Sequence, residues 1–282
     1  MWLQSIQQAI DYIERNLMED LQVEQLAKIT NLSSYHFQRA FSFLTGMTLG
    51  EYIRGRRLTL AAQEIASSDC KIIDIAYKYG YETPEAFAKA FRKQHGMKPT
   101  DARDKSRTIH SYNKLVIQVQ LKGAEPMNYK IIEKDSFQVV GLKRTFSCVN
   151  GEQSPKIARF WQDVNQDGTS GQLAVLIDGT VQGLIGICEV TSKDIMDYWI
   201  AASHDGEYTG NFETYTVPAS KWAIFEVHGA MPDAMPIMWQ KIFQEWLPSH
   251  PYELAETPEL EVYGEGNPSN DNYYSEIWVP IK

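Results

Sequence analysis

Apolar residues recur at helical spacing through the first hundred positions. One face of the opening segment carries Ile6, Ala9, Ile10, Ile13 and Leu17. A compact helix follows over 23–27 and ends near Asn31, and Ser33 has the residue type of an N-cap for a further helix that reaches Gly46. Good helix formers then run from position 49 to about 67. This part of the chain is therefore predicted to be all-α.

The helix, tight turn and helix occur twice, fifty positions apart. The shift matches Ser33 with Thr83, Phe37 with Phe87, Arg39 with Lys89, Ala40 with Ala90, Phe41 with Phe91, Gly46 with Gly96 and Met47 with Met97. Thr83 is the expected N-cap of the second copy, with Pro84 at the first helical position. Phenylalanines at i and i+4 share one helix face and are predicted to fill the core of each unit. The repeat predicts two helix-turn-helix units joined by one long helix.

The outward faces of the second helices in each unit are candidate DNA-binding surfaces. Their members are Ser34, Tyr35, Gln38 and Arg39 in the first unit, and Glu85, Ala88, Lys89 and Arg92 in the second. Gln and Arg suit bidentate contacts to adenine and guanine in the major groove, and two such helices on a rigid connector could enter grooves about 34 Å apart. Glu85 is acidic and Ala88 has no polar reach, so the second unit is expected to contribute more phosphate contacts than base readout.

These residues resemble the DNA-binding domain of the AraC family of regulators. The resemblance covers about residues 3–107 and is carried by SSYHFQRAFSFLTGMTLGEYIRGRRLTLAAQEI and IIDIAYKYGYETPEAFAKAFRKQHGMKPTDAR. It implies a double-stranded DNA operator as the ligand, RNA polymerase as the protein partner, and base-facing positions at Tyr35, Gln38 and Arg39, then Glu85, Ala88 and Lys89. We expect this domain to span 1–107.

The pattern changes after position 107. Residues 108–126 are predicted to be a linker with one short strand, VIQVQL, and residues 127–282 a second domain. In that domain IIEKDSFQVVGLKRTF and ETYTVPASKWAIFEVHG are each expected to be a strand pair, and PKIARFWQDV and MPIMWQKIFQEWL to be helices. Further strands are expected at LAVLIDG, LIGICEV, MDYWIAASHD, ELEVYGE and YYSEIWVPI. The prediction is an α+β domain of two pseudo-symmetric βαββ halves around a central groove.

Large aromatic residues and two glutamates are the candidate ligand-binding residues of that groove. They are Trp161, Tyr198, Trp199, Trp222, Trp239, Glu261, Tyr263, Glu276 and Trp278. Alternation places Tyr274, Glu276 and Trp278 on one face of their strand, and Glu261 and Tyr263 on one face of theirs. A carboxylate among aromatic rings attracts an organic cation through charge and cation–π interactions. Ordinary core packing and solvent-facing acids are the alternative explanation for the same residues.

Residues 127–282 also resemble the gyrase-inhibitor-like effector-binding domains of bacterial multidrug-response regulators. The resemblance is carried by VPASKWAIFEVHG, the helix ending in EWLP, PELEVYGE and SEIWVPIK. It implies an acidic, aromatic-lined cleft between the two halves, in which Glu261 and Glu276 are the expected acids. The expected ligand is a small cationic or amphipathic effector.

Charge and composition are consistent with this division. Residues 1–107 carry 15 Lys and Arg against 13 Asp and Glu, whereas residues 108–282 carry 12 against 23, so the acid lies in the second part. Arg54, Arg56 and Arg57 form a local basic cluster, as do Lys89, Arg92 and Lys93. The three cysteines are far apart and are expected to be reduced, and neither a metal nor a cofactor is expected. Since no apolar run reaches membrane-spanning length and the first residues do not form a signal peptide, we expect a cytoplasmic protein without a membrane partner.

The predicted function is sequence-specific transcription regulation, modulated by a small ligand that changes domain docking or the contact with polymerase. Two alternatives concern the second domain. A glutamate beside a tyrosine is also compatible with hydrolysis of reactive small molecules, although no nucleophile or metal motif supports an enzyme. An exposed apolar patch on that domain would instead favour binding of a protein partner.

Overall fold

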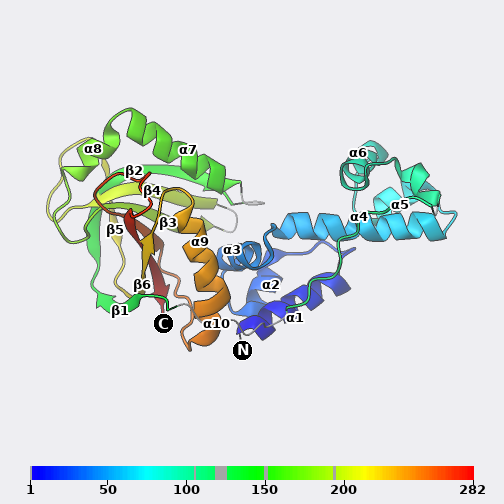
Figure 1. The fold of residues 1–282 in the computed structure, drawn as a ribbon, viewed down its shortest axis with the longest axis horizontal. Helices are drawn as coiled ribbons and strands as arrows, with labels where there is room; N and C mark the ends of the chain where they lie inside the picture. Colours follow the sequence, from blue (N-terminus) through cyan, green and yellow to red (C-terminus); the bar gives the residue numbers. More distant parts are fainter. Residues whose placement is uncertain (1, 105, 118–125, 149–151, 193–194) are drawn as a thin grey trace. The chain divides into compact units, whose positions relative to one another are not determined.

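The computed structural model describes residues 2–104, 106–117, 126–148, 152–192 and 195–282. The chain divides into two compact units, Met1–Gln120 and Leu121–Lys282. Figure 1 shows the first unit built from helices and the second from a large sheet with helices. We call them the helical unit and the sheet unit. None of the described helices combines the length and the apolar character that a membrane crossing requires.

The helical unit contains the predicted pair of helix-turn-helix motifs. Its elements are α1 (Trp2–Arg15), α2 (Val23–Thr30), α3 (Ser34–Thr45), α4 (Leu49–Ser67), α5 (Ile72–Lys78), α6 (Pro84–His95) and the 3-10 helix η1 (Pro99–Arg103). The first motif consists of α2 and α3, the second of α5 and α6, and α4 joins them (Figure 1).

The two motifs begin and end their second helices in the same way. Ser33 accepts a hydrogen bond from the His36 amide at the start of α3, and Thr83 accepts one from the Ala86 amide at the start of α6. Both helices end at a glycine with φ +72, Gly46 and Gly96, where a residue with a side chain would be strained. The repeat predicted from the sequence is therefore confirmed down to its caps.

Each motif has its own hydrophobic core, as the phenylalanine pairs predict. Phe37 and Phe41 are fully buried in a cluster with α1, whereas Phe87 and Phe91 are fully buried in a second cluster with the end of α4 and with α5. The residues after η1 join the same unit, because Ile109 packs against the second core while Leu115 and Ile117 pack against the first. Residues 111–117 have no regular secondary structure, and the rest of the predicted strand VIQVQL lies outside the described residues.

The sheet unit contains an eight-stranded antiparallel sheet. Its strands are β1 (Tyr129–Lys134), β2 (Phe137–Ser147), β3 (Leu184–Ser192), β4 (Ile195–Ser203), β5 (Glu213–Val217), β6 (Ser220–His228), β7 (Glu259–Tyr263) and β8 (Tyr274–Ile281). Its helices are α7 (Gln153–Gln166), α8 (Thr169–Ala174), α9 (Ala234–Lys241), the π-helical turn η3 (Ile242–Trp246) and α10 (Leu247–Ser249). This confirms the predicted α+β class.

The strand order β1-β6-β8-β7-β3-β4-β2-β5 explains the pseudo-symmetry. Exchanging the labels of the two halves (β1 for β5, β2 for β6, β3 for β7, β4 for β8) gives the same order read backwards, so the halves meet at the β3–β7 pair. Each half contains a βαββ unit, β2-α7-β3-β4 or β6-α9-β7-β8. The strand that precedes each unit in the sequence, β1 or β5, pairs with the edge strand of the other half.

Two local predictions in this unit were wrong. Strands β1 and β2 do not pair with each other, and neither do β5 and β6, because β1 pairs with β6 and β5 pairs with β2. The segment LAVLIDG is not a strand. It contains the end of α8 and a turn, and its Leu173 is buried in the contact that α8 makes with the sheet. The first error arises because apolar alternation shows burial but not which strand is the partner, and the second because a short apolar run does not distinguish a strand from the end of a helix.

Candidate functional site

The strand register decides which candidate residues can meet. Residues paired across an antiparallel ladder point to the same face of the sheet. Leu260 pairs with Trp278 and Val262 with Glu276, whereas Glu261 pairs with Ile277 on β8 and with Gly186 on β3. Glu261 and Glu276 therefore lie on opposite faces, and the prediction that both acids line one cleft is wrong.

Five of the nine candidates gather on the face of the sheet that α7 and α9 cover. We call this group the Glu261 cluster: Trp161, Tyr198, Trp239, Glu261 and Tyr263. The Trp239 indole donates to Glu261 Oε1 at 2.8 Å, and the Tyr263 hydroxyl donates to Glu261 Oε2 at 2.9 Å. Trp161 comes from α7 and Trp239 from α9, so each half of the unit supplies one helix to the same carboxylate region.

Trp161 of α7 contacts both tyrosines of the cluster. The Trp161 indole donates to the Tyr198 hydroxyl at 2.9 Å, and its ring meets that of Tyr263 edge-on with centroids 4.7 Å apart. Burial raises the pKa of both Tyr198 and Tyr263 well above the ordinary value of 10.0, and the negative charge of Glu261 adds to each shift. Both hydroxyls therefore stay protonated at neutral pH, so Tyr263 remains a donor to the carboxylate.

Gly186 makes room for this arrangement. A Cβ at position 186 would collide with the Tyr198 hydroxyl and would lie 3.6 Å from the Tyr263 ring. Sequence reasoning missed this residue. The signal was the glycine inside the apolar strand LIGICEV, because a glycine in a strand interior often marks a close approach by another group.

A second carboxylate cluster occupies the other face. In this Glu276 cluster the Tyr274 hydroxyl donates to Glu276 Oε1 and the Trp278 indole to Oε2, both at 2.7 Å. Lys130 Nζ lies 3.3 Å from Oε1 and forms an ion pair. By contrast, none of the described cationic side chains forms an ion pair with Glu261. The prediction from alternation that Tyr274, Glu276 and Trp278 share one face of their strand is thus confirmed. That face is opposite the one that carries Glu261.

The two remaining aromatic candidates belong to the apolar core on the Glu276 face. Trp199 stacks on Tyr215 with centroids 5.2 Å apart, and Trp222 meets Trp278 edge-on at 5.8 Å. Both indoles are at most 4% exposed. Trp199 and Trp222 are therefore core residues on the face opposite Glu261.

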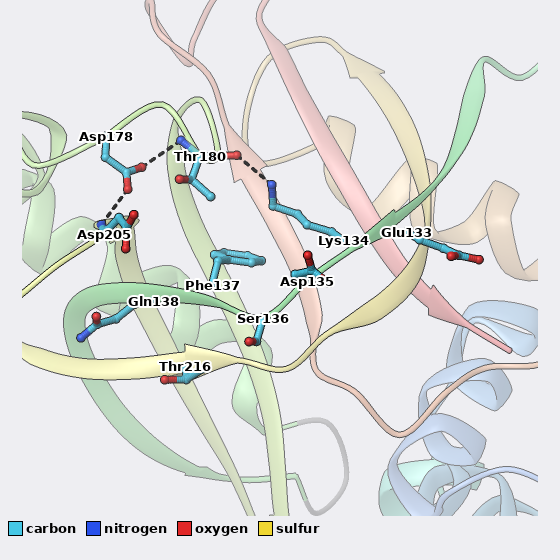
Figure 2. Close-up of a pocket in the computed structure, with 10 residues that line it drawn as sticks. All are labelled: Glu133, Lys134, Asp135, Ser136, Phe137, Gln138, Asp178, Thr180, Asp205 and Thr216. Atoms are coloured by element: carbon cyan, nitrogen blue, oxygen red, sulfur yellow. Dashed lines mark hydrogen bonds between the residues drawn. The ribbon is translucent and has the colours of Figure 1, made fainter.

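A surface pocket of about 620 Å³ lies elsewhere in the sheet unit (Figure 2). It is lined by the β1–β2 turn with Phe137, by Asp178 and Thr180 after α8, and by Asp205 after β4. In Figure 2 the Asp178 carboxylate accepts hydrogen bonds from the backbone amides of Thr180 and Asp205. None of the predicted ligand residues lines this pocket, and the described residues contain no group of acids, histidines and cysteines able to hold a metal ion.

The predicted DNA-binding residues lie on the second helix of each motif. Ser34, Tyr35, Gln38 and Arg39 are on α3, where Arg39 Nη1 donates to the Tyr35 hydroxyl at 3.0 Å. Tyr35 is buried, unlike the exposed position predicted for it. On α6, Glu85, Lys89 and Arg92 are exposed and Ala88 is half-buried, opposite the buried Phe87 and Phe91.

The predicted basic cluster at 54–57 has mainly a structural role. Arg56 Nη2 pairs with Glu14 Oε2 at 2.7 Å, and Arg57 donates to the carbonyl oxygens of Leu17 and Glu19. These contacts tie α4 to α1 and to the turn that follows it. Arg54 alone of the three is exposed.

Comparison with known proteins agrees with both folds. A model of an integron-associated effector binding protein matches residues 130–281, and a helix-turn-helix domain model matches residues 26–105. The regulatory protein SoxS of Salmonella typhimurium is 39% identical over 100 residues, which are 36% of this chain and 94% of SoxS. The multiple antibiotic resistance protein MarA of Escherichia coli is 32% identical over 114 residues, which are 39% of this chain and 90% of MarA.

A solved structure resembles the sheet unit. SAV2435 bound to tetraphenylphosphonium shares 28% identity with this chain at a TM-score of 0.51, and the match covers 55% of this chain and 94% of SAV2435. The fold and the matched regions together define a two-domain transcription regulator. The chain belongs to the AraC-type regulators by its helical unit and to the family of integron-associated effector binding proteins by its sheet unit.

Proposed function

We propose that the helical unit binds operator DNA and that a lipophilic organic cation, bound at the Glu261 cluster, changes this binding or the transcription that follows from it. One observation carries the ligand part of the proposal. Glu261 is a carboxylate set among Trp161, Trp239 and Tyr263 without a described ion-pair partner. Such a carboxylate gains both Coulomb and cation–π stabilisation when an organic cation approaches.

The similarity to SAV2435 supports this class of ligand, because the ligand of that protein is a bulky aromatic cation. In the structure Glu261 is hydrogen-bonded to Trp239 on α9. A cation that contacts Glu261 replaces this indole donor and thereby displaces α9 relative to the sheet. A ligand shifts an equilibrium only by its differential affinity for two states, and a displaced α9 supplies such a second state.

For DNA binding, we propose that α3 and α6 enter successive major grooves. At 1.5 Å per residue the 19 residues of α4 span about 28 Å, which suits two helices placed roughly one DNA turn apart. Arg39 and Gln38 of α3 are the proposed base readers, whereas Lys89 and Arg92 of α6 contact phosphates. RNA polymerase is the proposed protein partner, the cytoplasm the proposed compartment, and the proposed role is regulatory without catalysis.

The first experiment is fluorescence anisotropy of the full chain with the DNA upstream of its own gene and with a scrambled duplex, across a salt series. We expect tighter binding to the upstream DNA and a steep fall of affinity with salt. Addition of tetraphenylphosphonium should then change the affinity for the upstream DNA or its transcription in vitro. Equal binding to both duplexes would contradict the DNA proposal, and tight cation binding without either effect would contradict the regulatory proposal.

Two matched variants separate base readout from phosphate contact. Arg39→Ala should cost about 1–3 kcal/mol on the upstream DNA and much less on the scrambled duplex. Lys89→Ala should weaken binding to both duplexes by similar factors and reduce the salt slope by about one. An equal loss on both duplexes for Arg39→Ala would make Arg39 a phosphate contact.

Hydrolysis by the sheet unit is a second candidate, and it rests on the 2.9 Å hydrogen bond between the Tyr263 hydroxyl and Glu261. In that case Glu261 would act as the general base for a water molecule. Incubation of the chain with small esters and epoxides, followed by mass spectrometry, tests this directly. Turnover that is lost in Glu261→Gln would favour the enzyme, and its absence across the panel would remove this candidate.

A further inference from the structure

Residues 109–117, which follow η1, connect the two cores of the helical unit. Ile109 packs against the core of the second motif, and Leu115 and Ile117 pack against the core of the first. Sequence reasoning assigned these residues to a linker. We call them the strap.

The strap is held along its length by side chains of the helical unit. Near its start, Gln94 Nε2 of α6 donates to the His110 carbonyl oxygen at 3.3 Å and also to Gly55 O and Thr59 Oγ1 of α4. Tyr112 is bound on both sides of its backbone: its amide donates to Thr59 Oγ1 at 2.9 Å, and its carbonyl accepts from Arg56 Nη1 at 2.6 Å. The beginning of the strap is thus bound to α6 and to α4.

The far end of the strap is bound to α4 and α1. The Leu115 amide donates to the Tyr52 hydroxyl at 3.1 Å, and the Ile117 amide donates to Gln7 Oε1 at 2.8 Å. Lys114 Nζ forms an ion pair with Asp11 Oδ1 at 2.8 Å. Tyr52 and Arg56 in turn share Glu14, so the groups that hold the strap are themselves fixed to α1.

Gly55 shows that the fit is close. The Tyr112 ring lies directly over this glycine, and a Cβ at position 55 would be 2.8 Å from Tyr112 Cγ. Glycine in the middle of a helix lowers the stability of the helix relative to alanine. Helix propensity therefore favours alanine at position 55, whereas the close contact with Tyr112 requires glycine.

We propose that the strap sets the relative position of the two helix-turn-helix motifs and thereby the spacing of the DNA sites that they can bind together. The two motifs have separate cores, and α4 is the helix that joins them. A second connection that is bound to α6, α4 and α1 opposes bending and twisting about α4. Tyr112 and Gly55 act as positioning residues, because the contacts described for Tyr112 are with Gly55, Arg56 and Thr59 of α4 and not with the residues proposed to read DNA.

Spacing matters because DNA is helical. One additional base pair between two half-sites moves the second by about 3.4 Å and rotates it by about 35°. A rigid pair of motifs therefore loses affinity steeply on such DNA, whereas a loosely joined pair adapts. The proposal rests on DNA binding by the helical unit.

The test uses the full chain and a duplex selected from a random DNA pool by the wild-type protein, together with derivatives that carry one base pair more or fewer between the half-sites. The measured quantity is the ratio of affinity for the selected duplex to affinity for the altered ones. We expect a ratio of at least about 10 for the wild type and a fall of at least about threefold in Tyr112→Ala. Failure of the wild type to select any duplex would instead contradict the proposed function itself.

Two further variants separate positioning from folding. Tyr112→Phe keeps the ring over Gly55 and should keep the wild-type ratio, because no hydrogen bond of the Tyr112 hydroxyl is found among the described residues. Gly55→Ala gains helix propensity but displaces the ring, so it should lower the ratio while α4 keeps its helical content.

Hydrogen exchange at the amides of Tyr112, Leu115 and Ile117 reports whether the strap has been released. These amides should exchange faster in Tyr112→Ala and Gly55→Ala than in the wild type. A wild-type spacing ratio in both variants with these amides exposed would overturn the proposal. A reduced ratio in both, with Tyr112→Phe unchanged, would support it.

Discussion

The two faces of the sheet hold a carboxylate in nearly the same way but differ in its charge balance. Glu261 and Glu276 each accept one hydrogen bond from a tryptophan indole and one from a tyrosine hydroxyl. Glu276 also has Lys130 at 3.3 Å, whereas Glu261 has no described cationic partner and is covered by helices from both halves. The comparison indicates that similar hydrogen bonds can serve two roles. The charge of Glu276 is already balanced by Lys130, whereas the charge of Glu261 can still be stabilised by a bound cation.

The largest expected difference between the clusters concerns the tyrosine hydroxyls. Tyr263→Phe removes a donor from Glu261 and leaves only the Trp239 indole, so it should cost about 1.5–3 kcal/mol of unfolding free energy. Tyr274→Phe should cost less than about 1 kcal/mol, because Glu276 keeps both Trp278 and Lys130 and Tyr274 is 39% exposed. Chemical denaturation of the full chain measures both. Equal losses would remove the energetic distinction between the clusters.

Steric insertion tests the Glu261 cluster alone. Gly186→Ala forces a methyl group against the Tyr198 hydroxyl and should destabilise the sheet unit by about 1–3 kcal/mol. Gly171→Ala, in α8, is the matched control, since no atom lies within 4 Å of a Cβ at that position. The control should leave the melting temperature unchanged or slightly raised. An unchanged melting temperature for Gly186→Ala would show that the cluster is loosely packed.

Alkaline pH should affect the Glu261 cluster more than the Glu276 cluster. Burial raises the pKa of Tyr198 and Tyr263 well above 10.0, and burial also raises that of Tyr274. A raised pKa in the folded state means that stability is fully present below pH 10 and is lost as the pH rises further. The loss is at most about 1.4 kcal/mol per pH unit for each of Tyr198 and Tyr263, and it is smaller for Tyr274, which is 39% exposed and screened by water.

Melting curves between pH 9 and 11 check this expectation. The fall in the melting temperature of the sheet unit should be reduced most in Tyr263→Phe and less in Tyr274→Phe, because water screens part of the Tyr274 shift. A steeper fall in Tyr263→Phe than in the wild type would contradict the assigned cause.

The smallest effect is expected for the ion pair on the Glu276 face. Lys130→Ala should cost at most about 1 kcal/mol, since the lysine is 58% exposed and water screens the pair. The loss should shrink further in high salt, and Lys130→Arg should restore it. A loss above about 2 kcal/mol at physiological salt would mean that Glu276 depends on its cation.

The helical unit was predictable from sequence almost completely, because its signals are local. The N-caps Ser33 and Thr83 and the left-handed glycines Gly46 and Gly96 are fixed by their own turns. The strap was not predicted, since residues 109–117 have no periodicity and several of their contacts join a backbone amide to a distant side chain, as between Ile117 and Gln7.

In the sheet unit, alternation correctly placed Glu276 and Trp278 on one face of their strand, and Glu261 and Tyr263 on one face of theirs. It could not place the pairs on one face or two, because that depends on the register between β7 and β8. For the same reason the exchange of β1 and β5 between the halves was not predicted. Long-range pairing has no local signature in the sequence.

The most direct test of the account is calorimetric titration of tetraphenylphosphonium into the wild type, Glu261→Gln and Glu276→Gln. Both variants remove one carboxylate charge and keep the side-chain size. We predict that Glu261→Gln weakens binding at least about tenfold, or 1.4 kcal/mol, and that Glu276→Gln stays within about twofold of the wild type. Equal affinities in all three proteins, or a loss confined to Glu276→Gln, would contradict the assignment of the effector site to the Glu261 face.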